Sequence, residues 1–283
     1  MIRFVLIVVC LLSTASTFDD DDEEREVSYI DGGYFMDIDE APWSASIQML
    51  LEDHGEATVP LCYGAIVSPT VIVTAAQCIA DHPVSNYRVR VGSWFSASGG
   101  HFFEPKWLLI HEEYNPRFHT NDIGLIFFDT LITIEMAKPV HLPLQGDEIE
   151  VGEDVTAMGW KLIRQPGDTE DNEVIFNEEL QEVEAITMEV GLCQVPDTEI
   201  VDADVICAGD PEEVLDTCFA YTGGALMNEE GVMVGIFSWS LGCKDSAPGV
   251  YTKVSSHIDW MNDLLNVTWI NTSSLAKLQL WNS

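Results

Sequence analysis

Thr74-Ala75-Ala76-Gln77-Cys78 is the segment of this 283-residue chain that carries the most structural information. It begins at the last residue of a short run rich in Val and Ile at 71–74, a composition typical of a buried strand. Gln77 has an amide side chain, which forms hydrogen bonds but has no titratable group. Position 77 can therefore hold neighbouring groups in place but cannot take up a proton in catalysis.

Further short segments with the composition of strands lie on both sides of this one, separated by turn residues. They form two groups of six and predict an all-β protein built from two barrels. Val254, Ile258, Met261 and Leu265 recur at helical spacing and predict a closing helix over 254–265. The expected strands are 46–51, 61–67, 71–74, 87–92, 107–110 and 124–128, then 154–160, 180–188, 205–208, 224–227, 232–238 and 250–254.

The N-terminus has the pattern of a secretory signal peptide. A charged start at Arg3 precedes nine apolar residues at 4–12 and small residues at 13–15. We expect a signal peptide over 1–15, an acidic propeptide-like segment over 16–29, and a secreted, extracellular protein. No later apolar run reaches the roughly 18 residues that a membrane span needs, so no span is predicted.

Cysteine usage agrees with secretion. Of seven cysteines, Cys10 lies in the expected signal peptide, and the other six suggest three disulfides with 15 possible pairings. No pair has CxxC spacing, so we expect no zinc site. The stretch 93–103 contains no Asp or Glu, so we expect no calcium site there and no cofactor.

The chain is strongly acidic, with 48 Asp and Glu against 12 Lys and Arg and a formal net charge of −36. Nucleic acid and anionic membranes both require a positive surface, so neither is an expected partner. The acidity could steer basic partners or cations toward the protein. It could equally be a solvated surface that keeps the protein soluble.

Several short motifs, taken in their order along the chain, resemble those of the trypsin-like serine proteases of the S1 family. The resemblance covers about 30–265. Segment 74–78 is similar to TAAHC, with glutamine in place of histidine. The other matches are 30–33 with IVGG, 121–125 with the DIAL segment, 159–160 with GW, 218–224 with CxGDSGG, 238–239 with the start of SWG, and 248–251 with PGVY.

This resemblance implies two six-stranded antiparallel β-barrels, at about 30–140 and 141–253, with a C-terminal helix at 254–265. It also implies the disulfides Cys62–Cys78, Cys193–Cys207 and Cys218–Cys243.

The resemblance also indicates a degenerate catalytic triad. Asp122 is retained, whereas Gln77 replaces the general base and Thr222 replaces the nucleophilic serine. His82 is close to position 77 in sequence, but nothing in the sequence brings it to Thr222. Asp122 is instead expected to hydrogen-bond Ser238 or Gln77 in a structural role.

Activation and specificity positions are altered as well. Ala220 replaces a glycine beside the oxyanion hole, and Tyr221 replaces the aspartate that would bind a newly cut N-terminus. Asp216, Ser240 and Gly249 correspond to a specificity pocket, either a surviving cation site or an inherited remnant. The N-glycosylation motifs at Asn266 and Asn271 lie in a tail at 266–283.

Together these features predict a catalytically inactive serine protease homologue that binds extracellular proteins such as proteases, inhibitors or basic proteins. Two alternatives stay open. One is a weak endopeptidase using Thr222 and Asp122, and the other is a structural or storage-like acidic protein without a binding groove.

Overall fold

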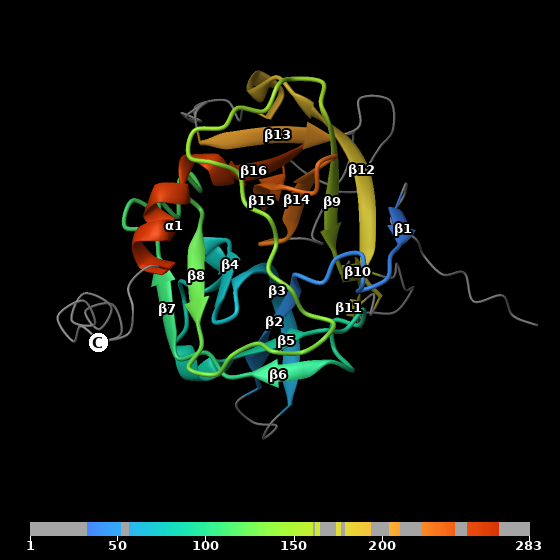
Figure 1. Cartoon of the computed structure of the whole chain (residues 1–283), viewed down its shortest axis with the longest axis vertical. Coiled ribbons are helices and arrows are strands. Elements are labelled where there is room, and N and C mark those ends of the chain that lie inside the picture. The colour runs from blue at the N-terminus through green and yellow to red at the C-terminus, as the bar shows by residue number, and fades with distance from the viewer. Residues whose placement is uncertain are drawn as a thin grey trace, which may run out of the picture.

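The structure is a computed structural model that describes residues 33–51, 57–160, 162–164, 174–176, 179–193, 204–209, 222–240 and 248–265. Two curved antiparallel sheets dominate it, one above the other in Figure 1. The expected signal peptide, acidic segment and C-terminal tail lie outside the described residues. Within those residues, no helix is long and apolar enough to cross a membrane.

The first sheet contains seven strands in the order β6-β5-β2-β3-β4-β8-β7. It is an open, curled half-barrel, so the prediction of a closed six-stranded barrel is wrong for this half. Its two edge strands follow each other across Pro105, which has no N–H for a ladder hydrogen bond. The strands are β2 (Ser44–Leu50), β3 (Thr58–Ser68), β4 (Val71–Thr74), β5 (Tyr87–Val91), β6 (His101–Phe103), β7 (Trp107–Ile110) and β8 (Gly124–Phe127).

The second sheet is a closed six-stranded barrel, as predicted. Pairing of β12 with β9 joins the ends of the strand series β12-β13-β16-β15-β14-β9. The strands are β9 (Asp154–Gly159), β12 (Gln181–Met188), β13 (Val205–Gly209), β14 (Ala225–Asn228), β15 (Met233–Ser240) and β16 (Gly249–Lys253). Two short strands, β10 (Leu162–Arg164) and β11 (Val174–Phe176), form a separate hairpin.

Strand β1 (Gly33–Phe35) lies on the second sheet, although residues from 30 onward were expected in the first barrel. It pairs with 181–183 of β12, whereas β13 pairs with 186–188 of the same strand. Strand β9 pairs with the opposite edge of β12. Strand β1 therefore lies on the same edge of β12 as β13, along the part of that edge that β13 does not cover.

Strands β5 and β12 alternate buried and more exposed side chains, as strand geometry predicts, whereas β4, β8 and β16 are buried along their whole length. Val183 and Ala185 of β12 face the interior of the second barrel with Leu226, Phe237 and Tyr251. The main core continues from the first sheet across to the second. Trp160, only 2% exposed, lies at this junction: its indole Nε1 donates to the carbonyl oxygen of Trp94 at 2.6 Å.

The C-terminal helix is shorter than predicted. Residues 254–265 divide into a 3₁₀ turn, η4 (Val254–Ser256), and the α-helix α1 (Ile258–Leu265). Figure 1 shows α1 beside β7 and β8, so the last element packs on the first half. Trp260 Nε1 donates to Glu112 Oε2 there at 3.0 Å. Other 3₁₀ turns are η1 (Ala76–Cys78), η2 (Val84–Asn86) and η3 (Val190–Cys193).

Candidate functional site

Gln77 lies in η1, immediately after β4, at the junction of the two sheets. A disulfide from Cys78 to Cys62 of β3 fixes this turn, and it is one of the pairs that the resemblance implied. Thr74 Oγ1 donates to the carbonyl oxygen of Tyr63 at 2.6 Å and holds the end of β4 against β3. Position 77 therefore sits on a rigid support.

Asp122 directly precedes Ile123 and β8, and it is completely buried. Its Oδ1 accepts the backbone N–H of Gln77 at 2.9 Å. Its Oδ2 accepts Gln77 Nε2 at 2.5 Å and the hydroxyl of Ser238, from β15, also at 2.5 Å. The predicted contact of Asp122 with Ser238 and Gln77 is confirmed.

The second half also holds the backbone of Asp122, since Thr252 Oγ1 of β16 donates to its carbonyl oxygen at 3.0 Å. Burial raises the pKa of the Asp122 carboxyl above its ordinary value. Hydrogen bonds from Ser238 and Gln77, together with the positive potential of His119, oppose that rise in pKa.

The amide of Gln77 has both of its N–H groups engaged. Nε2 donates to Asp122 Oδ2 and, at 2.8 Å, to the carbonyl oxygen of Ser238. Because Nε2 faces two acceptors, the orientation of the amide is determined, and its Oε1 cannot occupy the same place. A primary amide at this position binds both halves of the molecule together.

Thr222 is brought to the same region from the second half. Its carbonyl oxygen accepts the backbone N–H of Tyr63 at 2.9 Å and lies 3.7 Å from Cys78 Sγ. The next residue, Gly223, has φ +84°, and a Cβ there would lie 2.0 Å from the carbonyl oxygen of Tyr63. Only glycine fits this close approach of the two halves.

Two side chains near Asp122 were missed by the sequence analysis. His119 influences the pKa of Asp122, and its Nδ1 is buried with no hydrogen-bond partner in the described part of the chain. Burial raises the pKa of the Tyr114 phenol, and the charge of Asp122 adds to this rise. Both lie in the connection at 111–123, where His119 and Asn121 have φ of +51°. These two residues determine the course of the backbone, which the sequence pattern of the connection does not indicate.

The remaining site predictions are only partly within the described residues. Ser240 and Gly249 pair directly across β15 and β16, which places two of the three predicted specificity-pocket residues side by side. Cys193 and Cys207 form a second disulfide, again a pair that the resemblance implied. Asp216, Ala220, Tyr221, Cys218, Cys243, Asn266 and Asn271 lie outside the described residues. Among the described ranges, no group of three His, Cys, Asp or Glu side chains is arranged to hold a metal ion.

Comparison with known proteins identifies the family of this two-sheet architecture. The sequence profile of the Trypsin family matches residues 30–261, and the chain belongs to this family.

Individual relatives are similar over more than four fifths of the chain. A trypsin from Phaedon cochleariae is 31% identical, over 93% of this chain and 98% of its own length. A vitellin-degrading protease from Bombyx mori is also 31% identical, over 84% of this chain and 85% of its own. Among solved structures, neuropsin, a serine protease expressed in the limbic system of mouse brain, has a TM-score of 0.68 and 25% identity. The match covers 83% of this chain and 99% of neuropsin.

Proposed function

We propose that this member of the Trypsin family is a secreted protein without proteolytic activity that acts by binding other extracellular proteins. The observation that carries the proposal is the amide of Gln77, which donates to Asp122 and to the carbonyl oxygen of Ser238. These bonds give Gln77 a structural role at the position where, by resemblance, the family has its general base.

The chemistry of this arrangement supports inactivity. The family mechanism needs an imidazole to take the proton of the nucleophile, and an amide cannot do this. In subtilisin, which has the same kind of triad, removal of the base costs about 10⁶ in kcat, equivalent to roughly 8 kcal/mol of activation free energy. Unless another group acts as base, Thr222 would have to react as an unactivated hydroxyl.

The competing function is a weak endopeptidase with Thr222 as nucleophile. Asp122 is a poor candidate for its base, because both carboxylate oxygens already accept hydrogen bonds from Gln77 or Ser238. His119 is the better candidate, since it lies near Asp122 and its buried Nδ1 has no partner among the described residues. This imidazole gives the enzyme hypothesis a specific residue to test.

The proposal is tested by labelling the purified secreted protein with a fluorophosphonate, which reacts only with an activated hydroxyl. We expect no labelling at Thr222 and no hydrolysis of Arg- or Lys-containing peptides. Labelling that is abolished by Thr222→Ala would overturn the proposal. Loss of that labelling in His119→Ala as well would identify the base.

Restoring two residues provides a second measurement. Gln77→His with Thr222→Ser supplies a base and a nucleophile beside Asp122. We expect peptide hydrolysis far below that of an active relative, because Ala220 and Tyr221 still alter the oxyanion and activation positions. Each lost oxyanion donor lowers kcat by about 10²–10³. Turnover equal to that of a variant that also carries Ala220→Gly, Tyr221→Asp and Tyr29→Arg and has been cut before Ile30 would contradict this part of the reasoning.

A further inference from the structure

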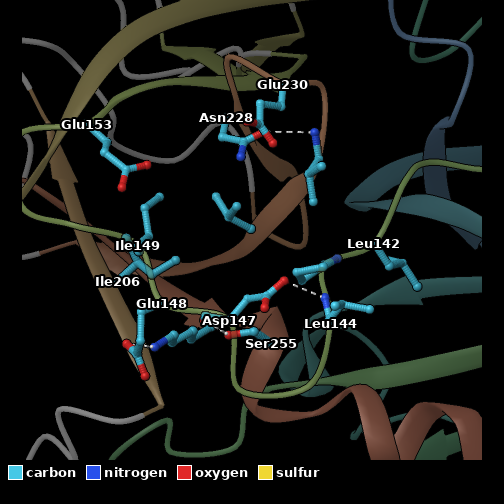
Figure 2. Close-up of a pocket in the computed structure, with 14 residues that line it drawn as sticks. Leu142, Leu144, Asp147, Glu148, Ile149, Glu153, Ile206, Asn228, Glu230 and Ser255 are labelled. Carbon is cyan, nitrogen blue, oxygen red and sulfur yellow. Dashed lines mark hydrogen bonds and ion pairs between the residues drawn. The ribbon is translucent and has the colours of Figure 1, made fainter.

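A pocket of about 400 Å³ lies away from the Gln77 site, between the segment that connects the two halves and the turn joining β14 to β15. Its apolar wall includes Ile149, Ile206, Val232 and Val234. The volume is within the range of about 300–1,000 Å³ that is typical of ligand pockets. Ile149 lies between Glu153 and Glu148 in Figure 2, so acidic groups flank this apolar surface.

Strand β16 separates the pocket from the Gln77 site. Thr252 bonds the carbonyl oxygen of Asp122, whereas the next residue, Lys253, lines the pocket. Successive side chains on a strand point to opposite faces, so the two sites lie on opposite sides of β16. An occupant of the pocket would therefore leave the Gln77–Asp122 contact unobstructed.

The acidic side of the pocket is preformed by hydrogen bonds within its own segment. Asp147 Oδ2 accepts the N–H of Leu144, and Glu153 Oε1 accepts the N–H of Glu150, both at 2.7 Å. Ser255 Oγ also donates to the carbonyl oxygen of Asp147 at 2.6 Å. A preformed site loses little conformational entropy when an occupant binds.

The lining charges select the kind of occupant. Asp147, Glu148, Glu153 and Glu230 face a single cation, Lys253, which leaves a net charge of −3. Nζ of Lys253 is already bonded to Glu148 at 2.5 Å, and its side chain is only 8% exposed. An anionic occupant would be repelled, and an added cation would be attracted to the other three carboxylates.

We propose that this pocket binds a lysine or arginine side chain presented by an exposed segment of a partner protein. The aliphatic stem would lie on Ile149 and Val234, and the charged end would reach Glu153 or Glu230, because long basic side chains combine both kinds of contact. A bare metal ion fits less well: no group of three acidic, His or Cys side chains in the described residues is close enough to hold one.

This inference names a partner surface for the proposed binding role and rests on it. Its test measures peptide binding and not proteolysis. The pocket hypothesis can therefore fail while the protein is shown to be inactive, and the pocket can bind the peptide even if the protein proves to be a protease. The probe is the blocked peptide Gly-Leu-Lys-Leu-Gly, titrated calorimetrically into the full-length protein. Two matched peptides replace the lysine with norleucine, which lacks the charge, or with diaminopropionate, which lacks the stem.

The decisive variant is Glu153→Gln with Glu230→Gln, which keeps an oxygen at position 153 to accept the N–H of Glu150. Its control is Asp154→Asn with Glu229→Gln, which changes the net charge equally at neighbouring exposed residues that do not line the pocket. We expect the pocket pair to raise the Kd of the lysine peptide at least tenfold and the control pair less than twofold. Both altered peptides should bind more weakly than the lysine peptide.

Three outcomes would overturn the proposal. Equal weakening by the two pairs would mean that only the overall charge matters. Equal binding of the norleucine peptide would mean that the pocket does not recognise a cation. Absence of saturable binding by the lysine peptide at millimolar concentration would mean that the pocket takes no such side chain.

Discussion

Replacing Gln77 with glutamate gives the sharpest test of the buried contact between the two halves. The substitution keeps the size of the side chain but puts a second carboxyl group where Nε2 now lies 2.5 Å from Asp122 Oδ2 and 2.8 Å from the carbonyl oxygen of Ser238. Two carboxylates this close cannot both ionise at low cost, so the folded variant should retain a proton that the pair shares.

The sign and size of the effect follow from proton linkage. The pair has a folded-state pKa raised above the unfolded value of about 4.3 for glutamate. The shared proton therefore contributes fully to the unfolding free energy of the variant below that unfolded-state pKa. This contribution is lost as the pH rises through the raised pKa. The loss is about 1.4 kcal/mol per pH unit, or roughly 3 kcal/mol between pH 5 and 7 relative to the wild type.

The assay is urea unfolding with disulfides intact, at half-unit steps from pH 4.5 to 8. A swapped control, Gln77→Glu with Asp122→Asn, has one carboxyl group facing one amide again and should regain the pH-dependent part of the stability lost at pH 7. The carbonyl oxygen of Ser238 still lacks the donor that Gln77 Nε2 supplied. If the single variant were as stable as the wild type at pH 7, or if the swap recovered nothing, position 77 would not contact Asp122 as described.

Two further predictions concern the close approach of the halves and the third disulfide. Gly223→Ala should lower the unfolding free energy by more than about 3 kcal/mol, because its Cβ would lie 2.0 Å from the carbonyl oxygen of Tyr63. Gly231 also has a positive φ, of +74°, but a Cβ there would have no atom within 4 Å. Gly231→Ala should therefore lower the unfolding free energy by only about 1 kcal/mol. Equal urea midpoints for these two alanine variants would contradict the contact. Non-reduced peptide mapping should find Cys218 joined to Cys243, and a free thiol at either residue would refute that pairing.

Much of the strand arrangement could be predicted from the sequence. Each of the twelve expected strands overlaps an observed one, since runs of β-branched and aromatic residues bounded by turns are a strong local signal. The missed strands, β1, β6, β10 and β11, each have three residues, too few to show an alternating pattern. Whether each sheet closes depends on pairing between distant strands, which local composition does not determine.

Only the residues of the candidate site that lie in short family motifs could be predicted from the sequence. The contact of Gln77 with Asp122 followed from the resemblance, because both residues lie in short motifs of the family. His82 drew attention by its position in sequence, yet it packs edge-on against Tyr87, with ring centroids 6.4 Å apart. His119, the histidine near Asp122, is placed by the backbone path of its loop.

The hydrogen bonds around Asp122 give its carboxylate a structural role that does not depend on catalysis. A buried carboxylate is costly unless it accepts hydrogen bonds, and here three donors surround it. Gln77 supplies two of these donors, and its amide N–H groups need no proton exchange to keep both Asp122 and the carbonyl oxygen of Ser238 satisfied. In an Asp122→Asn variant, an NH₂ group would replace one of the two accepting oxygens. Whichever way the new amide is oriented, this NH₂ group would face at least one of the existing donors. The glutamine and the aspartate therefore stabilise the junction as a pair, and the constraint on Asp122 does not require a titratable group at position 77.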